Sequence, residues 1–77
     1  MNYYSITQNN VLKAHVMART SDDAIQLYLE YVKTRNLPVT HFTAKQTTLA
    51  QVIGYNVHTV KPKINKGEPC VLFYYMS

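Results

Sequence analysis

The sequence predicts a small α+β domain with an N-terminal β-hairpin, one central α-helix and further strands, in the order ββαβββ. Two alternating segments joined by consecutive asparagines predict the hairpin. A capped amphipathic segment predicts the helix, and β-branched and aromatic residues in the second half predict the remaining strands. We therefore expect a single domain over residues 1–77, with the helix packed on a four- to five-stranded, mostly antiparallel sheet.

The hairpin is expected to pair residues 2–8 with residues 11–20. The first segment is rich in tyrosine, isoleucine and threonine, which suit a half-buried pleated surface. In the second, every other residue is apolar, so one face should pack and the other should meet water. The asparagines between them tolerate left-handed backbone angles and predict the turn.

Residues 22–35 carry the clearest helical signal. Ser21 is expected to be the N-cap, and the two aspartates after it favour the positive end of the helix dipole. Asn36, which precedes Leu-Pro, is expected to end the helix in a left-handed conformation. The stripe at helical spacing, expected to face the core, comprises Ile25, Tyr28, Leu29 and Val32.

The second half is harder to assign. Residues 39–44 predict a strand, whereas residues 47–64 suit either a helix or a strand. We favour a short helical turn around residues 48–52 followed by a strand over residues 55–61, because β-branched residues are frequent there.

The end of the chain is expected to be a loop over residues 61–69, turning at Gly67, followed by a strand over residues 70–76. This last strand is apolar on both faces, which is typical of a central strand or of one covered on both sides.

Residues 47–64 also bear a partial likeness to a DNA-reading helix-turn-helix. Ala50 and Gly54 are four residues apart, as the tight crossing and turn of that motif require, and Val60 lies where the second helix would bury a residue. Pro62 would interrupt that second helix, and the preceding segment is expected to be extended. We therefore expect the likeness to be coincidental.

Composition excludes several classes of protein. A chain that is 47% hydrophobic and 16% charged should fold. The single Cys70 excludes an intrachain disulfide and fits a reducing, cytoplasmic compartment. The N-terminal residues have neither the basic start nor the apolar run of a signal peptide, and no stretch approaches the roughly 20 apolar residues of a membrane span. We expect no association with membranes.

Enzymatic activity and cofactors are not expected either. The three histidines fall in different predicted strands, and two of the four acidic residues lie at the start of the helix, so neither a metal site nor a carboxylate pair is expected. Two glycines cannot supply a phosphate-binding loop. Cys70 opens an apolar strand and is expected to be a buried hydrophobe.

Surplus apolar and tyrosine surface predicts a macromolecular protein partner. Leu27 and Tyr31 widen the apolar arc of the helix, so either a later segment of the chain or a partner should cover them. From size and the lack of motifs, we expect a small inhibitor or regulator of the kind that viruses and mobile elements direct against host complexes, such as nucleic-acid-handling defence complexes. The candidate partner-binding residues are Tyr3, Leu27, Tyr31 and Tyr55.

The net charge of +4 supports an alternative, a basic nucleic-acid-binding module. An exposed sheet face and a lysine-rich loop would supply the cations, and nearby tyrosines would stack on bases. The candidate anion-binding residues are Lys13, His15, Arg19, Lys61, Lys63 and Lys66. A homodimer through a sheet edge or a helix face is a third possibility.

Overall fold

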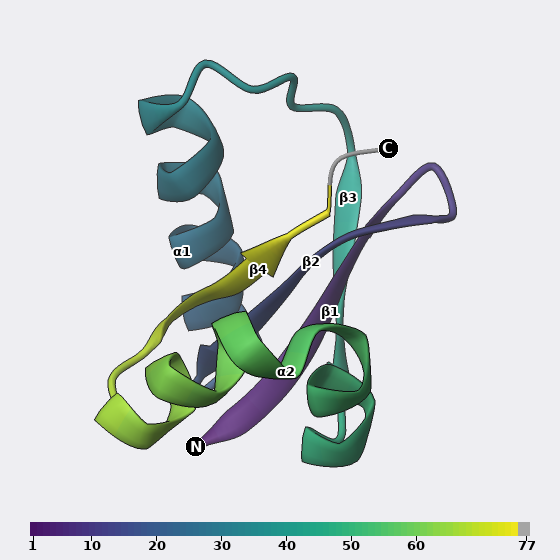
Figure 1. Cartoon of the computed structure of the whole chain (residues 1–77). Coiled ribbons are helices and arrows are strands. Elements are labelled where there is room, and N and C mark those ends of the chain that lie inside the picture. Colours follow the sequence, from purple (N-terminus) through teal and green to yellow (C-terminus); the bar gives the residue numbers. More distant parts are fainter. Residues whose placement is uncertain (76–77) are drawn as a thin grey trace.

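The computed structural model describes residues 1–75, except for the side chains of residues 55 and 56. A four-stranded antiparallel sheet in the order β3-β1-β2-β4 carries the helices α1 and α2 (Figure 1). The α+β class is confirmed, but the element order is ββαβαβ. The elements are β1 (Asn2–Gln8), β2 (Val11–Ala18), α1 (Ser21–Thr34), β3 (Phe42–Thr47), α2 (Leu49–Lys66) and β4 (Cys70–Tyr74).

The hairpin of β1 and β2 forms as predicted. Gln8 pairs with Val11, and the two residues between them, Asn9 and Asn10, have φ angles of 53° and 62°. Two consecutive left-handed residues match the twist of the flanking strands, which is why asparagine is favoured here. β2 ends at Ala18, two residues earlier than expected.

The N-cap of α1 is Thr20, one residue before the predicted Ser21. Its hydroxyl accepts from the backbone N–H of Asp23 at 3.2 Å, and its φ of −136° is extended. Serine and threonine cap almost equally well, so residue type alone does not separate neighbouring candidates.

The C-terminus of α1 follows the prediction. Asn36 has a φ of 53°, and its N–H donates to the carbonyl of Lys33 at 3.3 Å. The N–H of Leu37 donates to the carbonyl of Val32 at 2.9 Å, which completes a Schellman motif. Leu37 also packs against the buried cluster that contains Val32.

The predicted strand over residues 55–61 is wrong, because α2 is one helix from Leu49 to Lys66. β-branched residues lower helix propensity only slightly, and packing overrides that cost. Val52 and Val60 lie eight residues apart, so both face the sheet, and both are fully buried. A continuous helix also contradicts the helix-turn-helix likeness.

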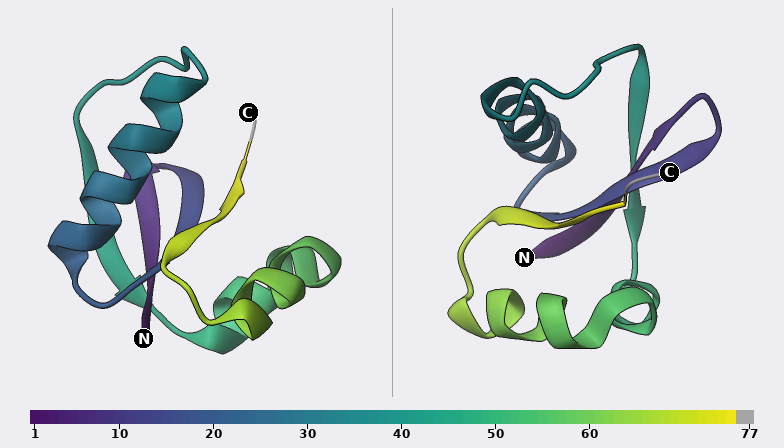
Figure 2. Two further views of the ribbon diagram at one scale, coloured as in Figure 1. Left: turned by 90° about the vertical axis from the view of Figure 1, so that its left-hand side faces the viewer. Right: turned by 45° about the horizontal axis from the view of Figure 1, so that its top comes forward.

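The ends of α2 match its sequence, and the helix is not straight. Thr48 caps the helix by accepting from the N–H of Gln51, and Gly67 ends it with a φ of 74°. The helix changes direction part-way along (Figures 1 and 2). Pro62 lies further along, inside the helix, where it has no N–H to donate to the carbonyl of His58 four residues earlier.

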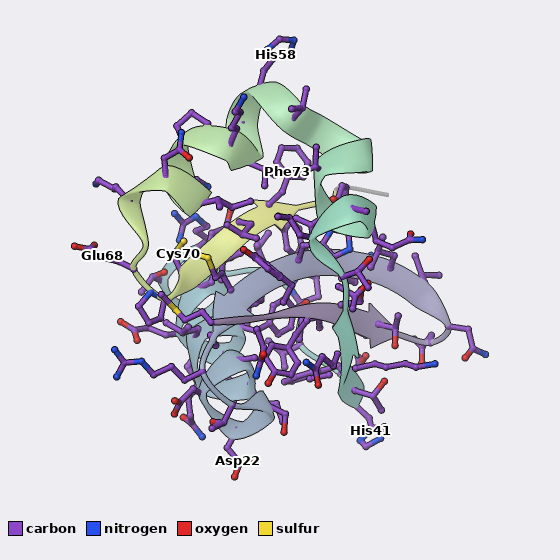
Figure 3. All side chains as sticks on the ribbon, turned by 90° about the horizontal axis from the view of Figure 1, so that it is seen from below. Asp22, His41, His58, Glu68, Cys70 and Phe73 are labelled. Carbon is purple, nitrogen blue, oxygen red and sulfur yellow. The ribbon has the colours of Figure 1, made fainter. Side chains whose placement is uncertain are left out.

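The sheet lies between the two helices, with a buried cluster on each side (Figure 2). On the α1 side the buried residues are Tyr4, Ile6, Ala14, Val16, Ala18, Ala24, Tyr28, Val32 and Val71. On the α2 side they are Met17, Val52, Val60 and Leu72, with Tyr3, Ile64, Cys70 and Phe73 packed against them. Phe73 lies beneath α2 (Figure 3). The sheet face expected to be open is therefore partly covered.

The last two strands form the edges of the sheet. β4 is covered on both faces, as predicted, because Val71 joins the α1-side cluster and Leu72 the α2-side cluster. β3 begins at Phe42, three residues later than expected, and places Phe42 and Ala44 on the core face. Neither described helix has the length and apolar character needed to cross a bilayer.

Candidate functional site

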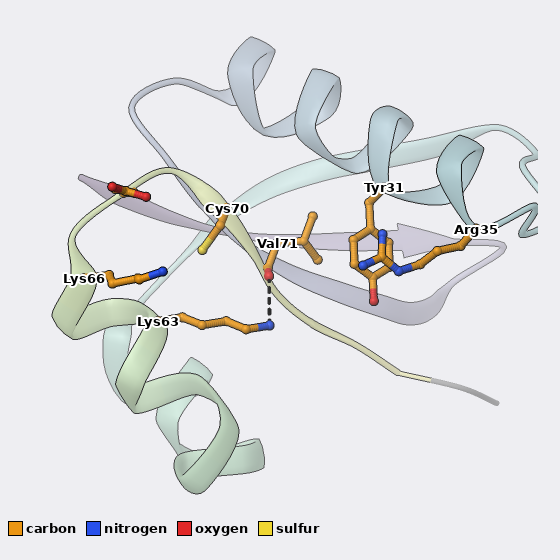
Figure 4. Close-up of a pocket in the computed structure, with 7 residues that line it drawn as sticks. Tyr31, Arg35, Lys63, Lys66, Cys70 and Val71 are labelled. Atoms are coloured by element: carbon orange, nitrogen blue, oxygen red, sulfur yellow. Dashed lines mark hydrogen bonds between the residues drawn. The ribbon is translucent and has the colours of Figure 1, made fainter.

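A groove runs along the outer side of β4, where the wall of α1 and the last turns of α2 approach the same sheet edge. We call it the β4 groove. Its largest cleft, of about 340 Å³, is drawn in Figure 4. The residues that line this cleft are Tyr31, Arg35, Lys63, Lys66, Glu68, Cys70 and Val71.

Two smaller clefts continue the groove along α1. One of about 240 Å³ shares Tyr31 and Val71 with the first cleft and adds Leu27 and Pro69. The next, of about 270 Å³, shares Leu27 and Pro69 and reaches Asp23. The groove therefore follows α1 from its first turn to its last.

The apolar wall of the groove comes from α1. The rings of Tyr31 and Tyr74 stack with centroids 5.8 Å apart and planes at 29°, and Leu27 packs against the same α1-side cluster. The C-terminal strand therefore covers part of Tyr31, as one of the two predicted alternatives requires, whereas Leu27 packs against the cluster that Val71 of this strand joins. Both side chains stay partly exposed and line the groove.

Arg35 lies over the ring of Tyr31. Its guanidinium carbon is 3.7 Å from the ring centroid, and its Nη1 donates to Thr34 Oγ1 at 3.3 Å. A cation over an aromatic face is attracted by the ring quadrupole. The contact therefore holds an exposed charge at the cleft.

Lys63 joins α2 to the sheet edge. Its Nζ donates to the carbonyl oxygens of Val71 at 3.3 Å and Leu72 at 3.0 Å. Consecutive carbonyls of a regular strand point in opposite directions, but the β2–β4 register skips Leu72, so a bulge brings both within reach of one ammonium. The same contact protects the β4 edge against pairing with another strand.

Cys70 lines the cleft as a free, partly exposed thiol. Burial raises the pKa of this thiol above its ordinary value, while the positive charge of Lys63 acts in the opposite direction. A raised pKa keeps the thiol protonated at neutral pH, where it is a weak nucleophile.

The structure brings together only some of the predicted partner-binding residues. Leu27 and Tyr31 share the β4 groove. Tyr3 is on the other side of the sheet, partly buried against the α2-side cluster. The side chain of Tyr55 lies outside the described residues.

The predicted anion-binding face on β2 does not form. His15 is only 1% exposed, and its Nδ1 lies 2.6 Å from the hydroxyl oxygen of Tyr75. Burial lowers the pKa of this imidazole, so it is neutral at pH 7. Lys13 lies near the start of β2 and Arg19 follows its last residue, so the extended chain between them separates the two by roughly 20 Å. This face is not open because α2, part of which the sequence predicts as a strand, covers part of it.

The predicted lysine loop is also wrong, because its lysines belong to the last turns of α2. Lys63 and Lys66 enter the β4 groove, whereas Lys61 lines a separate surface notch with Val57 and Pro62. These two groove lysines are the anion-binding candidates that the structure brings together.

Arg35 is the functional candidate that sequence reasoning missed. It follows Tyr31 by four residues on a helix, a spacing that places two side chains on one face. A tyrosine followed four residues later by an arginine therefore predicts a contact between the guanidinium and the ring.

Metal-ligating side chains are dispersed over the described part of the chain. There, no group of three His, Cys, Asp or Glu side chains is placed to hold a metal ion. His41 and His58 point away from the body of the protein at distant places (Figure 3).

No family model, curated protein or solved structure matches the chain. A function for it must therefore be argued from the β4 groove, where predicted partner-binding and anion-binding residues meet.

Proposed function

We propose that this is a non-enzymatic binding protein that docks on a macromolecular protein partner through the β4 groove. The observation that carries this proposal is the convergence of Leu27 and Tyr31 with Arg35 and two lysines along one sheet edge. Tyrosine and arginine are enriched in protein interfaces, where a large apolar contact is combined with polar anchoring.

The shape of the groove suits a protein segment better than a compact small molecule. Its three clefts lie in a row along α1 from Asp23 to Arg35, which spans about 18 Å of helix at 1.5 Å per residue. A small-molecule pocket usually encloses its ligand in one cavity. An extended chain can instead contact all three clefts in turn.

Docking of this kind supports a role as a small inhibitor or regulator of a host complex, because a domain of this size can act by occupying a partner's surface. A reducing, cytoplasmic compartment is part of the proposal, since it would keep the free thiol of Cys70 in the groove reduced. A second copy of the chain is a poorer occupant, because its net charge of +4 would face groove cations.

The test is affinity capture from a cell lysate with the tagged protein and two matched leucine variants. Leu27→Ala should remove the captured protein while the variant stays folded by circular dichroism. Leu49→Ala should leave capture unchanged, because Leu49 is 40% exposed at the start of α2 and does not line the groove. Capture that both variants retain would contradict docking at this groove.

Nucleic-acid binding is the second candidate, and one observation favours it: Arg35, Lys63 and Lys66 converge on one cleft. Phosphate contacts release counterions, so such binding weakens steeply as salt rises. The capture is therefore repeated with nuclease and at two salt concentrations. Recovery of nucleic acid alone, lost at high salt, would replace the protein-docking proposal.

A further inference from the structure

We infer that the occupant of the β4 groove is an extended acidic segment of the partner protein, whose carboxylate binds between Arg35, Lys63 and Lys66. This inference rests on the proposed function and adds the chemistry of the ligand. Three side chains from two helices bring positive charge to one cleft, and Glu68 is the acidic side chain in its lining. Figure 3 shows Glu68 pointing away from the body of the protein.

Charge changes sign along the groove. The cleft at the last turns of α1 and α2 is cationic, whereas the far end of the groove carries Asp23 and Glu30. An acidic group on a partner is therefore attracted to the cationic end and repelled from the other. This asymmetry sets the direction in which an acidic segment lies.

The cationic end is already held in place before a ligand arrives. Arg35 is fixed over the Tyr31 ring, and Lys63 is bonded to two carbonyl oxygens of β4. Within the described residues, neither of them nor Lys66 is paired with a carboxylate. Ordered side chains lose less conformational entropy on binding, so their charges are available at a lower cost.

The helix dipoles account for only part of this arrangement. Lysine and arginine are favoured at helix C-termini, where both α1 and α2 end in cations. That preference acts within each helix separately. It does not require the cations of the two helices to line one cleft, as they do in Figure 4, where Lys63 lies between Lys66 and Arg35.

Lys63 also determines how the segment can bind. Its ammonium already donates hydrogen bonds to the carbonyl oxygens of Val71 and Leu72. An incoming strand therefore cannot pair with β4 at this point. The segment must therefore use its side chains: an acidic one at the cations and an apolar one against Leu27 and Pro69. Such binding differs from the addition of a strand to a sheet edge.

The experiment is an amide NMR titration with two peptides that differ only in charge, a glutamate–leucine repeat and the matching glutamine–leucine repeat. The acidic peptide should shift the amides of Tyr31, Arg35, Cys70 and Val71, and the neutral peptide should leave them in place. Replacing Arg35 and Lys66 together by glutamine should weaken binding of the acidic peptide about tenfold, because two exposed cations that would contact its carboxylates are removed.

The control replaces two lysines that lie outside the cleft. Lys33→Gln combined with Lys61→Gln removes the same net charge from the same two helices, and should leave the affinity for the acidic peptide nearly unchanged. If both double variants lose the same affinity for the acidic peptide, the loss is due to net charge alone, and the inference is overturned.

The remaining outcomes separate the ligand classes. A single-stranded thymidine oligonucleotide that shifts the same amides more strongly than the acidic peptide would overturn the acidic segment in favour of nucleic acid. Partner capture that depends on Leu27 but is unaffected by the Arg35 and Lys66 substitutions would refute the acidic segment while leaving the docking proposal standing.

Discussion

The two sides of the sheet are built differently. The α1 side holds the larger buried cluster, centred on the fully buried Tyr28, which contacts Phe42 of β3 and Tyr74 of β4. The α2 side has a smaller cluster around Leu72, covered by a helix that contains both a glycine and a proline. Stability should therefore be concentrated on the α1 side.

The arrangement of the two layers determines where a binding surface can form. β4 is the edge strand whose buried residues enter both clusters, with Val71 on one side and Leu72 on the other. Its outer edge is left between the two layers, bounded by α1 and tied by Lys63 to α2. The groove forms where neither layer extends across the edge.

The largest effect is expected from Tyr28→Ala, which removes the centre of the α1-side cluster. It should lower the free energy of unfolding by about 3–5 kcal/mol, as large-to-small core substitutions of aromatic residues do. A chain of this length has about 4–12 kcal/mol in total, so urea denaturation should show a marginally stable protein. A loss below about 1 kcal/mol would contradict the unequal division of the core.

Val60→Ala makes the corresponding change on the α2 side. It should cost about 1–3 kcal/mol, because two methyl groups are lost from a fully buried site. Hydrogen exchange should accelerate in α2 more than in α1, since the α2-side cluster opens first. Equal acceleration in both helices would show that the two clusters unfold as one unit.

The buried His15 predicts a dependence of stability on pH. Burial lowers its pKa in the folded protein below the ordinary 6.5, so the unfolded chain binds a proton more readily. This contribution to stability is complete above pH 6.5 and is lost as pH falls below it. Urea midpoints measured from pH 7.5 to about pH 5 should therefore decrease.

Two exposed histidines supply the control for that measurement. In the variants His41→Gln and His58→Gln the urea midpoint should still decrease as the pH falls, because both replaced side chains are exposed. A midpoint that stays level across this range would show that His15 does not stabilise the fold through its neutral form.

The smallest effects come from the two glycines near α2. Gly54→Ala should stabilise the protein by about 0.5–1 kcal/mol, because a Cβ there meets no atom within 4 Å and glycine weakens a helix interior. Gly67→Ala should destabilise it by about 1 kcal/mol, because its φ of 74° is left-handed. Thermal unfolding of the pair should give opposite shifts, and a loss at Gly54 would contradict the helix at that position.

The hairpin and the ends of α1 could be predicted because their signals are local. The predicted core stripe of α1 is only half right, because the helix buries Ala24, Tyr28 and Val32 and leaves Ile25 and Leu29 partly exposed. Consecutive asparagines specify the turn, and the Schellman motif at Asn36 is determined by residues adjacent to it in sequence. Residues 49–66 have no such signals in their middle. Their β-branched residues and Pro62 are tolerated in a helix only because Val52 and Val60 find buried contacts with the sheet.

The groove could be predicted only in part, because its residues come from segments that are distant in the sequence. Leu27 and Tyr31 follow from the apolar arc of one helix, and Lys63 and Lys66 from the sequence of another. Their meeting at β4 depends on the sheet order, which brings distant segments together. Mistaking α2 for a strand also misplaced His15 on an open face, although it is buried.

The most direct test of the docking claim is photo-crosslinking to the captured partner from the two opposite edges of the sheet. A benzophenone amino acid is placed at Glu30, exposed on the rim of the β4 groove, or at Gln46, exposed on the β3 edge. Docking at the β4 groove should give a crosslinked partner from position 30 and none from position 46. Crosslinking from position 46 alone would contradict docking at the β4 groove.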